Sequence, residues 1–188
     1  MAKTGVNVSV KRVSNAAQLS DRLKSIGKRS VYVGIPATTA KERSASLLEM
    51  AGKLKPGKRS SKLRKAAKQD VNNAELLFIF TNGSPLRKQP PRPVLQPAVQ
   101  ADGNKQAISH ELAEAQKAAL LGLGEAEVLK RLSRAGLAAQ NAARRWFTDA
   151  RNGWEPNAES TIRRKGSNRP GIDTGSMRGA ITYVVDKE

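Results

Sequence analysis

Patterns of apolar and polar residues predict three elements near the start of the chain. Valine alternates with polar residues over 6–10, which predicts a half-buried strand. Apolar residues at helical spacing over 16–26, after the N-cap candidate Asn15, predict a helix. A second alternating run, 30–35, predicts another strand, which ends at Pro36 because proline cannot donate to a β ladder. The order is therefore β-α-β.

The middle of the chain combines a short apolar helix with a proline-rich segment. Asn72 and Glu75 have the spacing of a capping box and predict a helix that ends at Gly83. Its apolar residues predict a place in the core, Phe78 included. Five prolines fall within 84–97, and this density predicts an extended path without helix.

Two long helices and a final strand are predicted after the prolines. Apolar stripes run over about 104–121 and about 125–149, and the glycines of 122–124 would let the two helices pack as an antiparallel pair. Gly136 lies in the middle of the second helix and is expected to weaken it by about 1 kcal/mol relative to alanine. The β-branched and aromatic run 180–185 predicts the closing strand.

These elements predict one α+β domain over residues 1–188. We expect a small mixed or antiparallel sheet, packed by two long helices and by short ones. The domain divides into the β-α-β start (1–36), a basic loop (37–71), and the part with the proline-rich segment, the helical pair and the last strand (72–188).

Charge adds a prediction about partners. The chain has a formal net charge of +18, which favours a polyanionic partner such as nucleic acid, or an acidic protein. Like charges repel, so the most basic stretch is expected to be a long mobile loop, either an arm that faces DNA or a protein partner, or a solvated insertion. Its basic residues are Lys53, Lys55, Lys58, Arg59, Lys62, Arg64, Lys65 and Lys68.

No set of residues supports catalysis or a cofactor. The chain has no cysteine, which excludes disulfides and thiolate metal sites and predicts maturation in a reducing cytoplasm, and His110 is its single histidine. Gly52, Gly57 and Lys58 have the spacing of a phosphate-binding loop, but Arg59 stands where a Ser or Thr would bind Mg²⁺. We therefore expect no enzyme, no metal and no cofactor.

One triplet near the end of the sequence matches the letters of a catalytic loop. Asp173-Thr174-Gly175 has the letters of an aspartic-protease loop, but such an enzyme needs two of these aspartates in apolar settings, and this stretch is basic. We interpret the triplet as a turn that directs Arg178 and the final strand into the sheet.

Three segments, taken in order, resemble the neck or tail-completion (head–tail joining) proteins of tailed bacteriophages. The first is the short helix of 73–83, which ends in a glycine. The second, 91–98, is similar to a proline- and arginine-rich segment that precedes a long helix in that family. The third spans 154–185. Motif positions with expected structural roles are Gly83, Arg92, Pro93, Pro97, Asp173, Thr174, Gly175 and Arg178.

The chain departs from the family pattern at two places. Val94 stands where an aromatic residue is usual, and Phe80-Thr81 replaces a histidine–acidic pair. These departures concern core packing.

The resemblance implies a structural virion protein without turnover. It implies a ring subunit, a hexamer, between the head connector or head-completion protein and the tail terminator or tail tube, made in the host cytoplasm and then part of the virion. Contact with packaged DNA would be non-specific. The alternative is a stand-alone basic nucleic-acid-binding protein, although Tyr32 and Phe78, with expected core positions, would not be available to stack on bases.

Overall fold

A computed structural model describes residues 16–36, 43–69 and 71–187. The predicted strand at 6–10 and the N-cap Asn15 lie outside these residues. The elements in chain order are α1 (Ala16–Gly27), β1 (Arg29–Gly34), α3 (Arg43–Gly52), α4 (Lys58–Ala67), α5 (Asn73–Asn82), η1 (Pro85–Arg87), α6 (Leu95–Gln100), α7 (Asn104–Leu120), α8 (Glu125–Trp146), η2 (Ala150–Asn152), α9 (Glu159–Lys165), α10 (Ser176–Ala180) and β2 (Thr182–Lys187).

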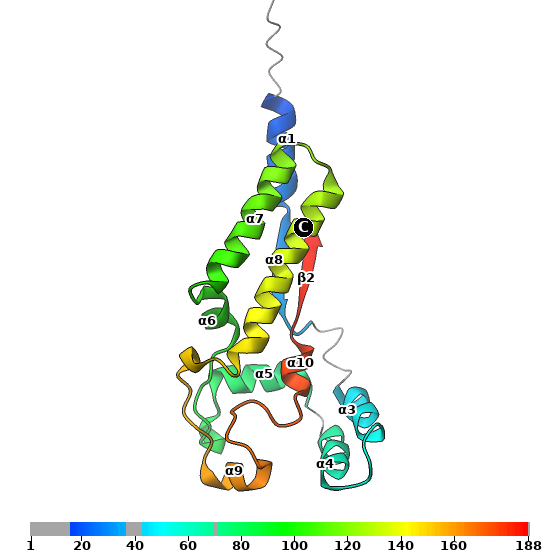
Figure 1. Ribbon diagram of the computed structural model, residues 1–188, viewed down its shortest axis with the longest axis vertical. Coiled ribbons are helices and arrows are strands. Elements are labelled where there is room, and N and C mark those ends of the chain that lie inside the picture. The colour runs from blue at the N-terminus through cyan, green and yellow to red at the C-terminus, as the bar shows by residue number, and fades with distance from the viewer. Residues whose placement is uncertain (1–15, 37–42, 70, 188) are drawn as a thin grey trace, which may run out of the picture.

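The molecule is long and has two differently built ends (Figure 1). The antiparallel pair of α7 and α8 forms the upper body, with the β1–β2 ribbon alongside α8 and with α1 at the top. The shorter helices α3, α4, α5, α9 and α10 form the lower end. Helices and an antiparallel sheet are both present, so the α+β prediction is confirmed, as are the first helix, the helical pair and both described strands.

The β1–β2 ribbon has one face on the helices and one face toward solvent. Its register pairs Val31 with Val185, and both pack against a cluster of small and aliphatic residues of α7 and α8. Tyr32 pairs with Val184 on the opposite face, where they are 53% and 43% exposed. The expectation that Tyr32 lies in the core is wrong, because side chains alternate along a strand and Val31 takes the inner face.

Gly136 makes room for the ribbon where it crosses α8. A Cβ at this position would lie 2.6 Å from Cγ of Tyr183, which no real side chain tolerates without movement. From the sequence, glycine at position 136 had only a cost to the helix. The structure adds a reason for glycine, which is the close approach of a β2 side chain to the α8 backbone.

We expect Gly136→Ala to lower the free energy of unfolding by about 1–2 kcal/mol, although alanine is the better helix former. The overpacking against Tyr183 costs about 1–3 kcal/mol and outweighs a gain of about 1 kcal/mol in helix propensity. In a Tyr183→Val background the same change should become neutral or stabilising. Urea unfolding of the wild type, the two single variants and the double variant measures the effect of Gly136→Ala in both backgrounds. Equal losses of stability in the two backgrounds would contradict the role given to Tyr183.

The main core lies where α8 meets the lower end. Its buried residues come from α5, the segment before α7, the end of α8 and the last part of the chain: Leu77, Phe80, Val94, Ala98, Ala143, Trp146, Phe147, Met177 and Ile181. The predicted apolar stripe of α8 is buried along its whole length. The core position predicted for Phe78 is wrong, since its side chain is 70% exposed while Leu77 and Phe80 take the inner face of α5.

Two further predictions need correction. The proline-rich segment is not free of helix, because η1 and the start of α6 lie within it, with Pro97 in the first turn of α6. Proline fits a first helical turn because the N–H groups there have no intrahelical acceptor. The closing strand begins at Thr182, and the short helix α10 before it was not predicted.

The basic stretch 37–71 is not a loop over most of its described length. α3 and α4 pack as a helical hairpin around Leu47, Ala51, Leu63 and Ala67. Arg43, which is 7% exposed, donates from Nη1 to the carbonyls of Ala66 and Val71, and burial lowers its pKa. The prediction failed because the basic side chains of α4 lie away from its buried face, so water screens their repulsion while a small apolar face holds the helices together, and the buried Arg43 is satisfied by backbone carbonyls.

Candidate partner-binding surface

The three segments that resemble the phage proteins meet in the main core. Leu77 and Phe80 come from the first segment, Val94 and Ala98 from the second, and Met177 with Ile181 from the third. Trp154 and Ile172, also of the third segment, pack against the same cluster. Segments that are distant in sequence therefore form one structural unit.

Arg92 joins the second segment to the third. Its side chain is almost fully buried; Nη2 donates to the carbonyl oxygen of Glu155 at 2.9 Å and Nε to the same oxygen at 3.3 Å. Nη2 also lies 3.4 Å from the carbonyl oxygen of Pro156. The guanidinium stands 5.9 Å from the centre of the Phe80 ring, and burial lowers the pKa of Arg92. Close by, Trp154 Nε1 donates to the carbonyl of Pro93 at 3.3 Å.

Three aromatic rings fill the space beside Arg92. Phe80 and Phe147 stack with their centres 5.8 Å apart, and Trp154 meets both rings edge-on. Gly171 touches this group with φ +70°, and a Cβ there would lie 2.7 Å from Phe80 and 2.8 Å from Phe147. The glycine is required both by its backbone conformation and by the rings.

The Asp173-Thr174-Gly175 triplet begins a helix. Gly175 has φ +82° and precedes α10, and the hydroxyl of Thr174 accepts a hydrogen bond from the N–H of Ser176 at 3.3 Å. Asp173 forms an ion pair with Lys62 of α4. The triplet is thus a turn, and it starts α10, with half-buried Arg178, before the chain enters β2.

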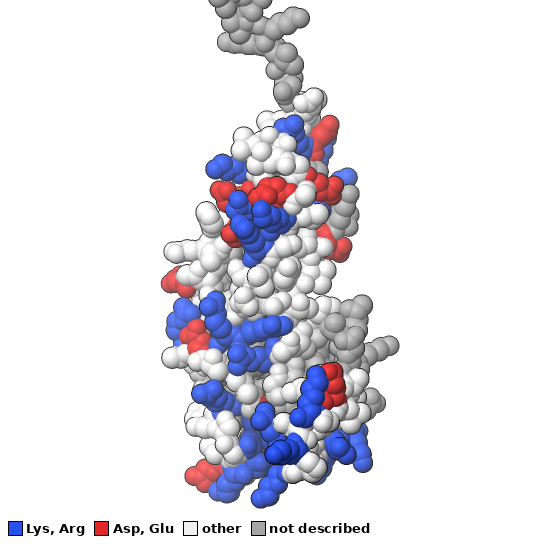
Figure 2. Space-filling view, turned by 45° about the vertical axis from the view of Figure 1, so that its right-hand side comes forward, with Lys and Arg blue, Asp and Glu red and all other residues white. Residues whose placement is uncertain are grey.

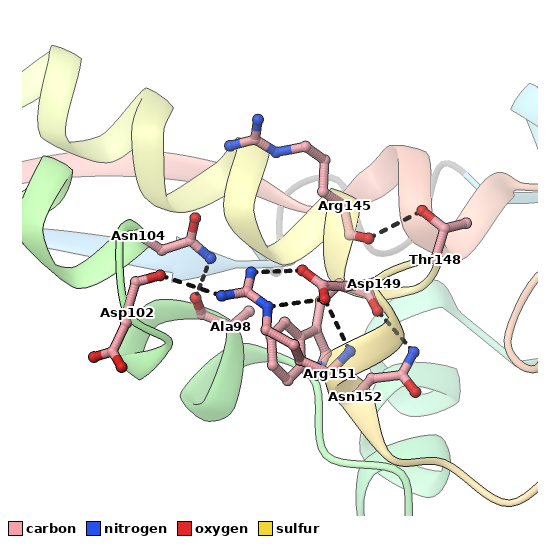
Figure 3. A network of polar contacts seen from close by, with 9 residues as sticks. Ala98, Asp102, Asn104, Arg145, Thr148, Asp149, Arg151 and Asn152 are labelled. Atoms are coloured by element: carbon pink, nitrogen blue, oxygen red, sulfur yellow. Dashed lines mark hydrogen bonds and ion pairs between the residues drawn. The ribbon is translucent and has the colours of Figure 1, made fainter.

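A polar network holds the corner at which α8 ends (Figure 3). Arg151 donates to both carboxylate oxygens of Asp149, reaches the carbonyl of Asp102 at 3.2 Å, and lies over Trp146. The side-chain hydrogen bond from Arg151, followed by its backbone N–H, lowers the pKa of Asp149 to about 2. This contact therefore favours folding fully above the ordinary pKa of 3.8 and loses that effect as the pH falls toward 2.

The eight basic candidates lie together on the hairpin at the lower end. Lys53 and Lys55 occupy the turn between α3 and α4, and the other six lie on α4 or directly after it. Figure 2 shows many Lys and Arg side chains around this end. A neighbouring contribution from α9 was not predicted: Arg163, Arg164 and Lys165 lie there, and their adjacency in the chain was the available signal.

Lys62 and Lys165 come near each other around Asp173. Lys62 makes the ion pair, while Lys165 is half-buried and donates to the carbonyl of Arg169. Burial is the main cause that lowers the pKa of Lys165, and the charge of Lys62 adds to it. α4 and α9 therefore belong to one basic surface, which we call the basic end. It consists of Lys55, Lys58, Arg59, Lys62, Arg64, Lys65, Lys68, Arg163, Arg164 and Lys165.

Ion pairs involve only some of the described cations in each half of the molecule, and Lys24, Lys28, Lys105 and Arg134 of the upper body have none among the described residues. In the upper body Arg29 pairs with Glu125, Lys130 with Glu127, and Arg131 with Glu111 and Glu127. On the hairpin most basic candidates have no ion pair within the described part of the chain: Lys55, Lys58, Arg59, Arg64, Lys65 and Lys68. Their charge is therefore available to a partner.

In the described residues, metal-ligating groups, hollows and long apolar helices are the features that concern other kinds of partner. Within the residues that the structure describes, no three His, Cys, Asp or Glu side chains gather into a possible metal site. Two hollows have volumes of about 360 and 600 Å³; the larger lies between α1 and the α7–α8 turn and is lined partly by Arg22, Lys24 and Lys28. No described helix has the length and apolar character needed to cross a membrane.

Comparisons with protein-family models, with curated protein sequences and with solved structures found no match to this chain. The resemblance to phage neck proteins therefore rests on the three sequence segments alone.

Proposed function

We propose that the chain is a structural subunit of a tailed-phage neck, a tail-completion protein that joins the head connector to the tail tube as one member of a ring. The observation that carries the proposal is the meeting of the three family-like segments in one core. Arg92 bonds to the backbone of Glu155 and Pro156, and Ser176 bonds to Asn73, so the residues that carry the resemblance contact one another. These contacts make the three segments parts of one structural unit.

Exposed apolar side chains also support an assembly role. Leu86 is 99% exposed at the tip of the loop that includes η1. Paired hydrogen bonds between the backbones of Ser84 and Gln89 close this loop, and Gly83 packs tightly on Pro91 at its base. Burial of this leucine against a neighbouring subunit would remove its apolar surface from water, which favours assembly. In the proposed ring a neighbouring subunit covers it.

We expect Leu86→Ser to weaken ring assembly by roughly 10- to 100-fold in dissociation constant, since burial of a leucine is worth about 1.5–3 kcal/mol. The stability of the single subunit should change by less than about 0.5 kcal/mol, because the side chain makes no core contact. Leu86→Met is the matched control and should assemble normally. Sedimentation across a concentration series measures both variants, and unchanged assembly of Leu86→Ser would remove the loop from the interface.

Native mass spectrometry tests the proposal itself. The chain is measured alone and with candidate connector and tail-terminator proteins, and a ring should give a multiple of the 20.3 kDa subunit. The expected ring is a hexamer, of about 120 kDa from six such subunits. A chain that stays monomeric with every such partner would contradict the neck proposal.

The alternative function is a stand-alone nucleic-acid-binding protein, and the unpaired cations of the hairpin favour it. The two functions differ in the oligomeric state in which the protein acts. A stand-alone binder would bind nucleic acid as a monomer and would ignore tail proteins, whereas a neck subunit would assemble with them. The same native mass experiment, repeated with a short duplex added, separates the two.

A further inference from the structure

We propose that the basic end binds double-stranded nucleic acid through its backbone phosphates, without reading the sequence, and that the outer face of α4 is the principal contact. This inference goes beyond the assembly role and does not depend on ring formation. Three observations on α4 support it: the separation of apolar and cationic side chains onto opposite faces, the absence of large apolar and aromatic side chains from the outer face, and the density of positive charge.

α4 has one apolar face and one cationic face. Ser60, Leu63 and Ala67 are buried against α3. On the opposite side Lys58, Lys62 and Lys65 follow one another at i, i+4 and i+7, so they line a single face of the helix. The apolar contacts hold the helix in place, and the cationic face therefore projects away from the hairpin.

The composition of the outer face is a poor match for a protein interface and for single-stranded nucleic acid. Its exposed positions are lysine, arginine and serine, with no large apolar side chain, whereas protein interfaces have an apolar centre. α4 also has no aromatic ring: Phe80, Phe147 and Trp154 pack against one another inside the molecule, and the exposed ring of Phe78 belongs to α5. Single-stranded nucleic acid is held largely by stacking on such rings, so a duplex is the better match.

The charge density of α4 suits a duplex backbone. Five of its ten residues are Lys or Arg and none is acidic. Ten helical residues span about 15 Å, so the three lysines of the outer face follow one another about every 5 Å, with Arg59 and Arg64 at its sides, which is of the same order as the spacing of about 3.4 Å between charges along one strand of a duplex. The cations of α9 extend this surface beside Lys62, and Arg164 has no ion pair among the described residues. Contacts of this kind go to phosphates and carry no sequence information.

The test is fluorescence anisotropy of a labelled duplex of about 30 base pairs, titrated with the full chain between about 50 and 200 mM salt. The hairpin variant changes Lys58, Arg59, Arg64 and Lys65 to Gln, and it keeps Lys62 so that the ion pair with Asp173 remains. The control variant changes Lys24, Lys28, Lys105 and Arg134 to Gln, which removes the same charge from exposed positions of the upper body. Circular dichroism and thermal melting confirm that both variants fold.

We expect the hairpin variant to lose roughly 100-fold in affinity at low salt, and the slope of log K against log salt to fall by about 3–4, since each phosphate contact contributes about 0.9. The control variant should lose less than about fivefold, with its slope nearly unchanged. Duplexes of different sequence should bind alike, and a single strand of equal length more weakly.

Three results would overturn the inference. The first is an equal loss in both variants, which would mean that only net charge matters. The second is tighter binding of the single strand. The third is displacement of the duplex by poly-glutamate at an equal concentration of charge, which would point to an acidic protein surface. None of these results affects the mass of the assembly measured by native mass spectrometry. Failure of the duplex-binding inference can therefore be told apart from failure of the neck proposal.

Discussion

Gly171→Ala should destabilise the protein by about 3–5 kcal/mol, the largest effect that we expect of a single added methyl group. Two costs combine at this position. The backbone has φ +70°, where an L side chain costs about 1–2 kcal/mol, and the new Cβ would lie 2.7 Å from Phe80 and 2.8 Å from Phe147. The two rings belong to a stacked, buried group and cannot both move aside. Chemical unfolding measures the loss.

Gly166→Ala separates the two costs. Gly166 also has φ +70°, but no atom lies within 4 Å of the position that a Cβ would take. It should therefore lose only about 1 kcal/mol, and the difference between the two variants gives the packing cost at the aromatic group. Equal losses would show that backbone strain is the whole effect and that the rings tolerate the methyl group.

Arg92→Leu should lower the free energy of unfolding by about 3 kcal/mol, although leucine is apolar and the site is buried. The guanidinium gives charged hydrogen bonds to the carbonyls of Glu155 and Pro156, each worth about 1.5–3 kcal/mol when its acceptor is left without another donor. It also contacts the face of Phe80. For a chain of 188 residues this corresponds to a fall in Tm of roughly 6–12 °C, read from a thermal melt.

Two further variants make this prediction specific. Arg92→Lys keeps the charge but not the planar fork, so it should recover about half of the loss. Arg169→Leu removes an exposed arginine of the third segment and should change stability by less than about 0.5 kcal/mol. If Arg92→Leu behaves like Arg169→Leu, the junction between the second and third segments does not depend on Arg92.

Sequence patterns were sufficient where one face of an element is apolar over several turns. The stripe of α8 from Val128 to Trp146 was predicted and is buried, and the capping box of Asn72 and Glu75 begins α5 as expected. In both cases the signal is local, because the spacing itself identifies the buried face or the helix start.

Sequence patterns gave wrong or incomplete predictions where tertiary contacts determine the structure. α3 and α4 bury so few apolar residues that the positive charge dominates their sequence, and only their mutual packing explains the helices. Tyr32 and Phe78 are apolar enough for a core, yet neighbours on the inner faces already fill it. The role of Gly136 could not be predicted either, because it depends on Tyr183, which comes from the other end of the chain.

The location of the basic candidates was predictable in part. Their identity followed from composition, since the eight Lys and Arg of 53–68 include no acidic neighbour. Their arrangement on one helical face required the structure, and so did the proximity of α9, because Lys62 and Lys165 are about a hundred residues apart and meet only around Asp173.

The separate core of the α3–α4 hairpin has a consequence for cooperativity. Leu47, Ala51, Leu63 and Ala67 form a cluster apart from the main core. Within the described residues the hairpin meets the rest of the fold through the ion pair of Lys62 with Asp173 and through contacts of α3 with α10. Local opening of the hairpin thus exposes little of the main core, so the hairpin has the character of a foldon of its own. Its charged face can therefore change, by mutation or by exchange of the whole hairpin, without cost to the fold that α8 organises.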